Sequence, residues 1–205
     1  MNVNIVAVGK IKEKYLKDAI DEYSKRLSRF CRLKITEVPD EAMSDRPSAA
    51  EKAAILKKEA EKINSAIGNC DVLVSLCVEG KQLPSEKFAD FFAQEAVKGA
   101  NSFTFVIGGS LGLSEEIKAK SKLRLSFSEM TFPHQLMRVI LLEQIYRAFK
   151  INANESYHKK FKKLLTNPTK KNKIIINKKL LRQKKGRQNF FERADYGVSS
   201  AKVPA

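Results

Sequence analysis

The sequence predicts a three-layer α/β domain built on a largely parallel, five-stranded sheet. Short apolar runs rich in β-branched residues recur five times, stretches with helical apolar spacing separate them, and glycine or serine marks many of the boundaries. The expected strands cover residues 2–8, 33–38, 70–78, 102–107 and 123–127. This pattern predicts the elements but not the order of the strands in the sheet.

The segments between these strands have the spacing and the end signals of helices. The main expected helices cover residues 13–30, 48–67, 85–99 and 135–150. Ser48 and Glu51 have the spacing of a capping box, and Gly68 is suited to end the helix that they open. Ser85 is the expected cap of the following helix.

Composition limits the kind of chemistry that the chain can perform. The three cysteines form no CxxC pair, and two histidines cannot complete a zinc-type ligand set. The apolar run at the N-terminus is only about five residues long, which is too short for a signal-peptide core or a membrane span. We therefore expect a soluble cytoplasmic protein with no metal and no membrane partner.

The formal charge of +16 is unevenly distributed along the chain. From Lys160 onward there are 14 lysines and arginines against two acids, which leaves only +4 for residues 1–159. The composition also changes after residue 159, where Lys and Asn dominate without an amphipathic period. We expect an α/β domain over residues 1–159 and a basic, disordered extension over residues 160–205.

A glycine cluster, Gly108, Gly109 and Gly112, follows the fourth expected strand. Glycines permit sharp turns and close backbone approach to a ligand. The cluster is not GxGxxG and does not follow the first strand, so a nicotinamide-binding Rossmann motif is disfavoured. Taken alone, it favours an ordinary turn into a helix capped by Ser114.

The next loop, residues 126–134, has the composition of a nucleotide-binding loop. It combines three hydroxyl side chains, three large apolar side chains and a stiffening proline before a helix: Ser126, Ser128, Thr131, Phe127, Met130, Phe132 and Pro133. Ligands of parallel α/β proteins bind where strands end, so two such loops in succession predict a pocket for a nucleotide-like cofactor. His134 fits a catalyst in this loop, but also an ordinary residue at a helix start.

The expected helix over residues 135–150 carries apolar residues at nearly every angle. Such a helix must be covered on all sides, which predicts contact with a second subunit. Arg138, Glu143 and Arg147 lie on the same helix and need partners or ligands there. A set of salt bridges and a functional role for either arginine explain them equally well.

With these residues identified, the chain resembles the RlmH family of 23S rRNA pseudouridine N3-methyltransferases, which are small SPOUT methyltransferases. The similarity covers residues 1–159 in order, and the most specific part is residues 125–151. The shared motifs are VAVGK, EVPDE, SLCVEGK, FVIGGSLGL, LSFSEMTFPHQLMRVILLEQIYRAFKI and the terminal YHK.

This resemblance implies a deep trefoil knot in the C-terminal part of the sheet domain. It also implies a homodimer that binds S-adenosylmethionine in the knot loops, completes each active site with the partner subunit, and acts on 23S rRNA in the assembled ribosome. The implied cofactor residues are Leu76, Gly108, Gly109, Phe127, Ser128, Glu129, Met130, Thr131 and Phe132. The implied catalytic residues, on the side of the methyl acceptor, are His134, Arg138, Arg147, Tyr157 and His158.

Methyl transfer from a sulfonium to N3 of pseudouridine needs alignment and removal of the imide proton, but no metal or nucleophilic side chain. The reaction therefore needs a base that takes the proton or basic groups that stabilise the anion; His134, Arg138 and Arg147 are the available candidates, and the sequence does not rank them. The extension departs from the family pattern, which ends at YHK. It could block the active site, extend the RNA-binding surface or hang free.

Two other functions remain compatible with the sequence. The first is methylation of another RNA base by the same kind of domain. The second is a non-enzymatic ribosome- or RNA-binding role that uses the basic extension, although the intact glycine turn and the loop over residues 126–134 argue against loss of cofactor binding.

Overall fold

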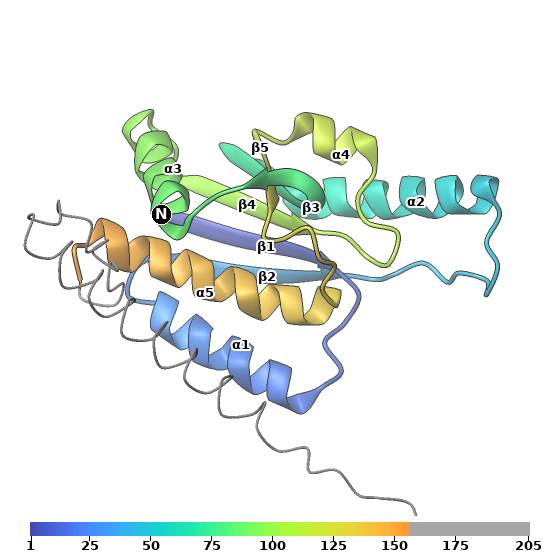
Figure 1. Ribbon diagram of the computed structural model, residues 1–205, viewed down its shortest axis with the longest axis horizontal. Coiled ribbons are helices and arrows are strands. Elements are labelled where there is room, and N and C mark those ends of the chain that lie inside the picture. The colour runs from blue at the N-terminus through green and yellow to red at the C-terminus, as the bar shows by residue number, and fades with distance from the viewer. Residues whose placement is uncertain (156–205) are drawn as a thin grey trace, which may run out of the picture. The chain divides into compact units, whose positions relative to one another are not determined.

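The computed structural model describes residues 1–155, which belong to one compact unit, Met1–His158. The extension over residues 160–205 and the predicted site residues Tyr157 and His158 lie outside the described residues. Strands and helices alternate along the described chain (Figure 1). The elements are β1 Asn2–Val8, α1 Lys14–Leu27, β2 Arg32–Val38, α2 Ala49–Ile67, β3 Val72–Gln82, α3 Ser85–Val97, β4 Ser102–Ile107, α4 Glu115–Lys120, β5 Leu123–Ser126 and α5 His134–Asn152.

The five strands form one sheet in the order β2-β1-β4-β3-β5, and every neighbouring pair is parallel. The predicted parallel five-stranded sheet is therefore confirmed. Because all the strands run in the same direction, their carboxyl ends lie at one edge of the sheet. The glycine turn after β4 and the loop after β5 consequently meet at that edge.

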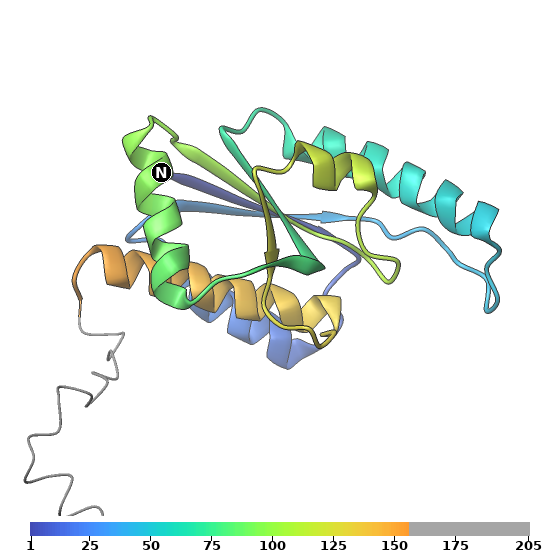
Figure 2. The same cartoon turned by 45° about the horizontal axis from the view of Figure 1, so that its top comes forward.

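Helices cover both faces of the sheet. The views in Figures 1 and 2 place α1, α3 and α5 on one face and α2 and α4 on the other. The inner strand β1 packs into both layers: Ile5 and Ala7 belong to the core under α5, and Val6 and Val8 to the core under α2 and α4. This two-sided burial explains why β1 is a continuous apolar run rather than an alternating one.

The helix ends show which capping predictions are correct. The Ser48 hydroxyl accepts a hydrogen bond from the Glu51 N–H at 3.1 Å, as expected, but the Glu51 carboxylate bonds to Ser44 instead of returning to Ser48. The prediction that Ser85 caps α3 is wrong, because Pro84 occupies the cap position. The Ser85 hydroxyl instead donates to Gln144 Oε1 of α5 at 2.8 Å.

Strand β3 runs four residues beyond its predicted end and pairs with β5 in two registers. The register shifts between Leu76 and Lys81, and Gly80 lies in the shifted segment. A Cβ atom at Gly80 would lie 2.7 Å from the Leu125 carbonyl carbon. Only glycine fits here, because the backbones of β3 and β5 come too close for a side chain.

Much of helix α5 is covered by the protomer itself. Leu141, Leu142 and Ile145 are fully buried in the core beneath α5, and α5 packs against both α1 and α3. The sequence predicts a second subunit because α5 is apolar on all sides. Packing within the protomer already covers much of this apolar surface, so the composition of α5 does not by itself require a second subunit. The exposed apolar surface of this helix includes Leu136.

Candidate functional site

A cavity of about 430 Å³ opens at the carboxyl edge of the sheet, where β3, β4 and β5 end. Its walls come from the end of β3, the glycine turn after β4 and the loop after β5. Nine of the residues predicted for the site line it: Leu76, Gly108, Gly109, Phe127, Ser128, Met130, Thr131, Phe132 and His134. Glu129 is exposed and is not part of this lining.

The loop after β5 is held in shape by its own hydroxyl groups. Ser126 Oγ donates to the Ser128 carbonyl at 2.9 Å, and Ser128 Oγ accepts from the Met130 N–H at 3.0 Å. Met130 is 73% exposed and Phe132 is 38% exposed, although both line the cavity. The loop thus presents uncovered apolar side chains beside backbone polar groups, which is the composition of a small-molecule site.

The glycines of the turn after β4 are required by the packing of the turn itself. A Cβ atom at Gly108 would lie 2.3 Å from the Gly112 carbonyl oxygen, and one at Gly109 would lie 3.1 Å from Val8 Cγ1. Gly112 has φ of +81°, a conformation that side chains disfavour. These contacts agree with the ordinary turn into a helix that the glycine cluster favours when it is taken alone, and Ser114 caps that helix as expected.

A buried carboxylate supports this turn from the face that α2 covers. Glu59 is 5% exposed, and its oxygens lie 3.4 Å from the position that a Cβ at Gly109 would occupy. Burial raises the pKa of Glu59, against a hydrogen bond from the Glu41 N–H that lowers it. Glu59 thereby closes the turn on the side that faces α2.

His134 begins α5 and lines the cavity. Its Nε2 atom lies 3.5 Å from the position of a Cβ at Gly9, so the ring lies directly beside Gly9, whose φ of +83° favours glycine. Burial lowers the pKa of His134, the nearby Arg138 charge lowers it further, and Asp40 opposes both effects. The imidazole is therefore neutral at neutral pH and can accept a proton.

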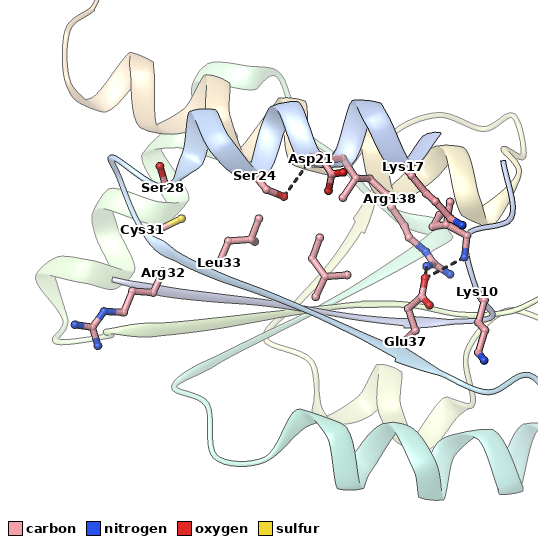
Figure 3. A pocket seen from close by; sticks show the side chains of 13 residues that line it. Lys10, Lys17, Asp21, Ser24, Ser28, Cys31, Arg32, Leu33, Glu37 and Arg138 are labelled. Atoms are coloured by element: carbon pink, nitrogen blue, oxygen red, sulfur yellow. Dashed lines mark hydrogen bonds and ion pairs between the residues drawn. The ribbon is translucent and has the colours of Figure 1, made fainter. Parts of the chain in front are cut away.

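Arg138 lies one turn beyond His134 but does not line the cavity. Its side chain is fully buried and donates to Glu37 Oε1 at 2.7 Å (Figure 3). It also donates to the Val8 carbonyl at 2.9 Å and to the Gly9 carbonyl at 2.6 Å. The guanidinium group thus ties α5 to the ends of β1 and β2. Arg138 therefore donates three hydrogen bonds within the protomer.

Arg147 lies on the same helix, far from the cavity. Its guanidinium group forms an ion pair with Glu143, one turn earlier. It follows His134 by 13 residues, which corresponds to roughly 20 Å along a helix. Within one protomer, the structure therefore brings His134 to the cavity but does not bring Arg147 there.

Three further titratable side chains line the cavity: Cys77, Glu79 and Lys118. The sequence pattern did not single them out as site residues. Lys118 forms ion pairs with Glu79 and Glu115. Burial, followed by the Glu79 charge, raises the pKa of Cys77, so its thiol stays protonated. Glu79 directly follows the third expected strand, which could have indicated it, whereas Cys77 lies inside that strand and nothing in the sequence marks Lys118 of α4.

Residues 1–155 contain no cluster of three side chains suited to hold a metal ion. In the same part of the chain, no helix combines the length and hydropathy needed to cross a bilayer.

Comparison with known proteins identifies the family. Residues 1–158 match the family described as "Predicted SPOUT methyltransferase". The chain is 52% identical over 159 residues to ribosomal RNA large subunit methyltransferase H of Streptococcus suis and 54% identical over 159 residues to that of Clostridium novyi. Each alignment covers 78% of this chain and the whole of the relative.

Among solved structures, the chain is similar to a probable methylase family protein from Haemophilus influenzae. The TM-score is 0.48 at 14% identity, over 83% of this chain and 73% of the other, which is too weak to add to the sequence relationship. The sequence relationship is sufficient: the chain belongs to the SPOUT methyltransferases, whose knotted α/β fold its sequence predicts, and within them to the family of ribosomal RNA large subunit methyltransferases H.

Proposed function

We propose that the protein transfers the methyl group of S-adenosylmethionine to N3 of a pseudouridine in 23S rRNA of the assembled ribosome, in the cytoplasm. The observation that carries this proposal is the cavity at the carboxyl ends of β3, β4 and β5. It gathers eight predicted cofactor residues and one predicted catalytic residue in a chain whose relatives are named ribosomal RNA large subunit methyltransferase H.

The cavity suits S-adenosylmethionine in size and chemistry. Its volume of about 430 Å³ lies within the range of roughly 300–1,000 Å³ typical of small-molecule sites. Apolar side chains such as Leu76, Phe127 and Met130 suit a purine ring, and Lys118 and Glu79 suit the charged amino-acid end. When bound, S-adenosylmethionine supplies an electrophilic methyl group on a sulfonium whose departure leaves a neutral thioether.

The residues of the chain have to orient the acceptor base and remove its N3 proton. His134 is the best candidate for the proton acceptor, because it lines the cavity and its lowered pKa keeps it neutral. Arg138 fits a positioning role, since its contacts with Glu37 and with the Val8 and Gly9 carbonyls fix the start of α5. Cys77 stays a thiol, which agrees with direct methyl transfer without a covalent enzyme intermediate.

A homodimer would give Arg147, Tyr157 and His158 a route to the cavity of the partner subunit. In the described residues, the outer surface of the paired helices α1 and α5 exposes two large hydrophobic side chains: Tyr15 is 67% exposed and Leu136 is 38% exposed. Leu136, Ile140, Glu143 and Arg147 follow one another at helical spacing along α5. This mixed surface supports a two-fold contact between copies of the chain.

The direct test is a methylation assay with S-adenosylmethionine that carries a labelled methyl group. The substrates are assembled ribosomes that contain the pseudouridine but lack its N3 methyl group, and matched ribosomes that carry uridine at the same position. We expect labelling of the first substrate only, with mass spectrometry of the digested rRNA placing the methyl group on N3.

Two results would contradict the proposal in different ways. A methyl group found on another nucleotide would keep the enzyme class and change its target. Tight binding of S-adenosylmethionine, measured by calorimetry, without methylation of any ribosomal substrate would favour a binding protein that retains the fold.

A further inference from the structure

A second, larger depression lies away from the cofactor cavity, between helix α1 and the edge strand β2. Its volume is about 940 Å³, and its lining includes the apolar residues Ile20, Leu33 and Ile35. Strand β2 pairs with β1 on one side only, so the groove runs beside the edge of the sheet. It extends from Lys10 and Arg138 at one end to Cys31 and Arg32 at the other.

The rim of this groove is predominantly cationic. Lys10, Lys17 and Arg32 line it, and none of them forms an ion pair within residues 1–155. Of the two acidic residues in the lining, Glu37 is paired with Arg138, which leaves Asp21 as the acid not engaged in an ion pair with a described residue. Lys118 and Lys122, near the opposite edge of the sheet, are instead held by glutamates.

Two further exposed lysines extend the cationic surface from the groove toward the cofactor cavity. Lys12 and Lys14 lie between Lys10 and Lys17 in the sequence, and neither has an ion pair among the described residues. The Lys12 N–H donates to Gln135 Oε1 at 3.0 Å, which fixes this loop against the first turn of α5, next to His134. The cations therefore begin beside the proposed proton acceptor and continue along α1.

The remaining lining residues help to identify what this groove could bind. No aromatic side chain is present among the lining residues, so bases would find no stacking platform. The single lining thiol, Cys31, is buried, and its burial raises its pKa to about 11, which excludes a reactive thiolate. At the inner end, Arg138 keeps one buried Nε–H without a partner in residues 1–155.

We infer that this groove is the track for the sugar-phosphate backbone of the substrate RNA, leading the strand to the His134 end of the cofactor cavity. The inference rests on the proposed function and adds where the RNA binds. Lysines on a rim supply charge without fixed donor geometry, so the track contributes affinity and orientation but does not choose the base. The acceptor nucleotide is selected at the cavity.

The test compares two double variants of the full chain that carry the same change of charge. Lys10→Gln/Lys17→Gln removes two rim lysines, and Lys52→Gln/Lys57→Gln removes two exposed lysines without ion pairs from α2, on the opposite face of the sheet. Binding to a fluorescent RNA hairpin is followed by anisotropy at several salt concentrations. Methylation kinetics are measured with the ribosomal substrate.

For the rim variant, we expect the slope of log affinity against log salt to fall by roughly 1.4–1.8, the contribution of two phosphate contacts. We also expect about a tenfold higher KM for ribosomes at moderate salt, with kcat, the affinity for S-adenosylmethionine and the modified nucleotide unchanged. The α2 variant should match the wild type in all of these measurements.

Lysine acetylation with an amine-reactive reagent, read by mass spectrometry, gives a second measurement that does not depend on catalysis. RNA should protect Lys10 and Lys17 but not Lys52 and Lys57. Equal salt slopes and equal protection in the two sets would overturn the inference even if the enzyme methylates ribosomes. Protection of Lys10 and Lys17 by ribosomes but not by RNA alone would assign the groove to a ribosomal protein instead. If the lysines are protected by RNA but no ribosomal substrate is methylated, the proposed function is rejected and the RNA track is not.

Discussion

Replacing Arg138 with methionine should destabilise the folded chain and not only slow the reaction. The substitution keeps a long apolar side chain but removes three hydrogen bonds from a fully buried guanidinium group. Removing one member of a buried ion pair typically costs about 3–5 kcal/mol. The Glu37 side chain is 36% exposed and also accepts from the Ile11 N–H at 3.0 Å, so part of its charge stays solvated and bonded.

We therefore expect a loss at the low end of this range, about 3 kcal/mol of unfolding free energy. For a domain of this size, each kcal/mol lowers Tm by about 2–4 °C, which predicts a decrease of about 6–12 °C. Arg29→Met is the matched control. Arg29 pairs with Glu155 on the surface, where such a pair contributes about 0–1 kcal/mol.

Urea denaturation and calorimetry measure both variants, and a methylation assay is performed well below the lower Tm. Arg138→Met should show the large loss of stability, with a residual activity that depends on how well His134 stays in place. If Arg138→Met melts within about 2 °C of the wild type but has no activity, the reasoning is refuted. Arg138 would then touch the substrate, which is the role that the family resemblance implies.

Three further predictions follow from the geometry of the cavity and of α5. Because the pKa of His134 is lowered from its usual value near 6.5, the acid limb of kcat/KM should lie below pH 6.5 and disappear in His134→Gln. For the same reason, below pH 6.5 the unfolded chain binds more protons than the folded chain, so the contribution of His134 to stability should decrease as the pH falls. Gly108→Ala should lower both thermal stability and affinity for S-adenosylmethionine, since its Cβ would meet the Gly112 carbonyl, and a normal Tm with normal affinity would contradict this. Leu142→Asp should unfold the protomer because Leu142 is fully buried, whereas Leu136→Asp should leave the circular dichroism spectrum unchanged and shift light scattering toward monomer.

The elements of the fold were predictable from local patterns, but their arrangement was not. The runs at Asn2–Val8 and Ser102–Ile107 are apolar at five of seven and four of six positions, because both strands are covered on two faces. No local feature indicates that β5 pairs outside β3, or that β3 continues to Gln82 through a shifted register. Gly80 is the residue that permits this close approach, yet in the sequence it is a single glycine among polar neighbours.

The cavity was predictable for a different reason. Parallel strands bring their carboxyl ends to one edge, so residues that follow successive strands lie at the same edge, and here they come together because β4 and β5 both neighbour β3. The role of Arg138 could not be predicted in this way, since its partner Glu37 is 101 residues away in the sequence. A buried arginine on an apolar helix indicates that a partner exists, but the partner depends on tertiary structure.

The end of β1 connects stability and chemistry in this fold. The Val8 and Gly9 carbonyls hold Arg138, while the ring of His134, one helical turn earlier, lies beside Gly9. Movement of α5 along its axis would break the Arg138 contacts and displace the imidazole from the cavity at the same time. The position of His134 therefore depends on an ion pair that does not line the cavity, and Arg138 can affect the reaction strongly without touching a reacting atom.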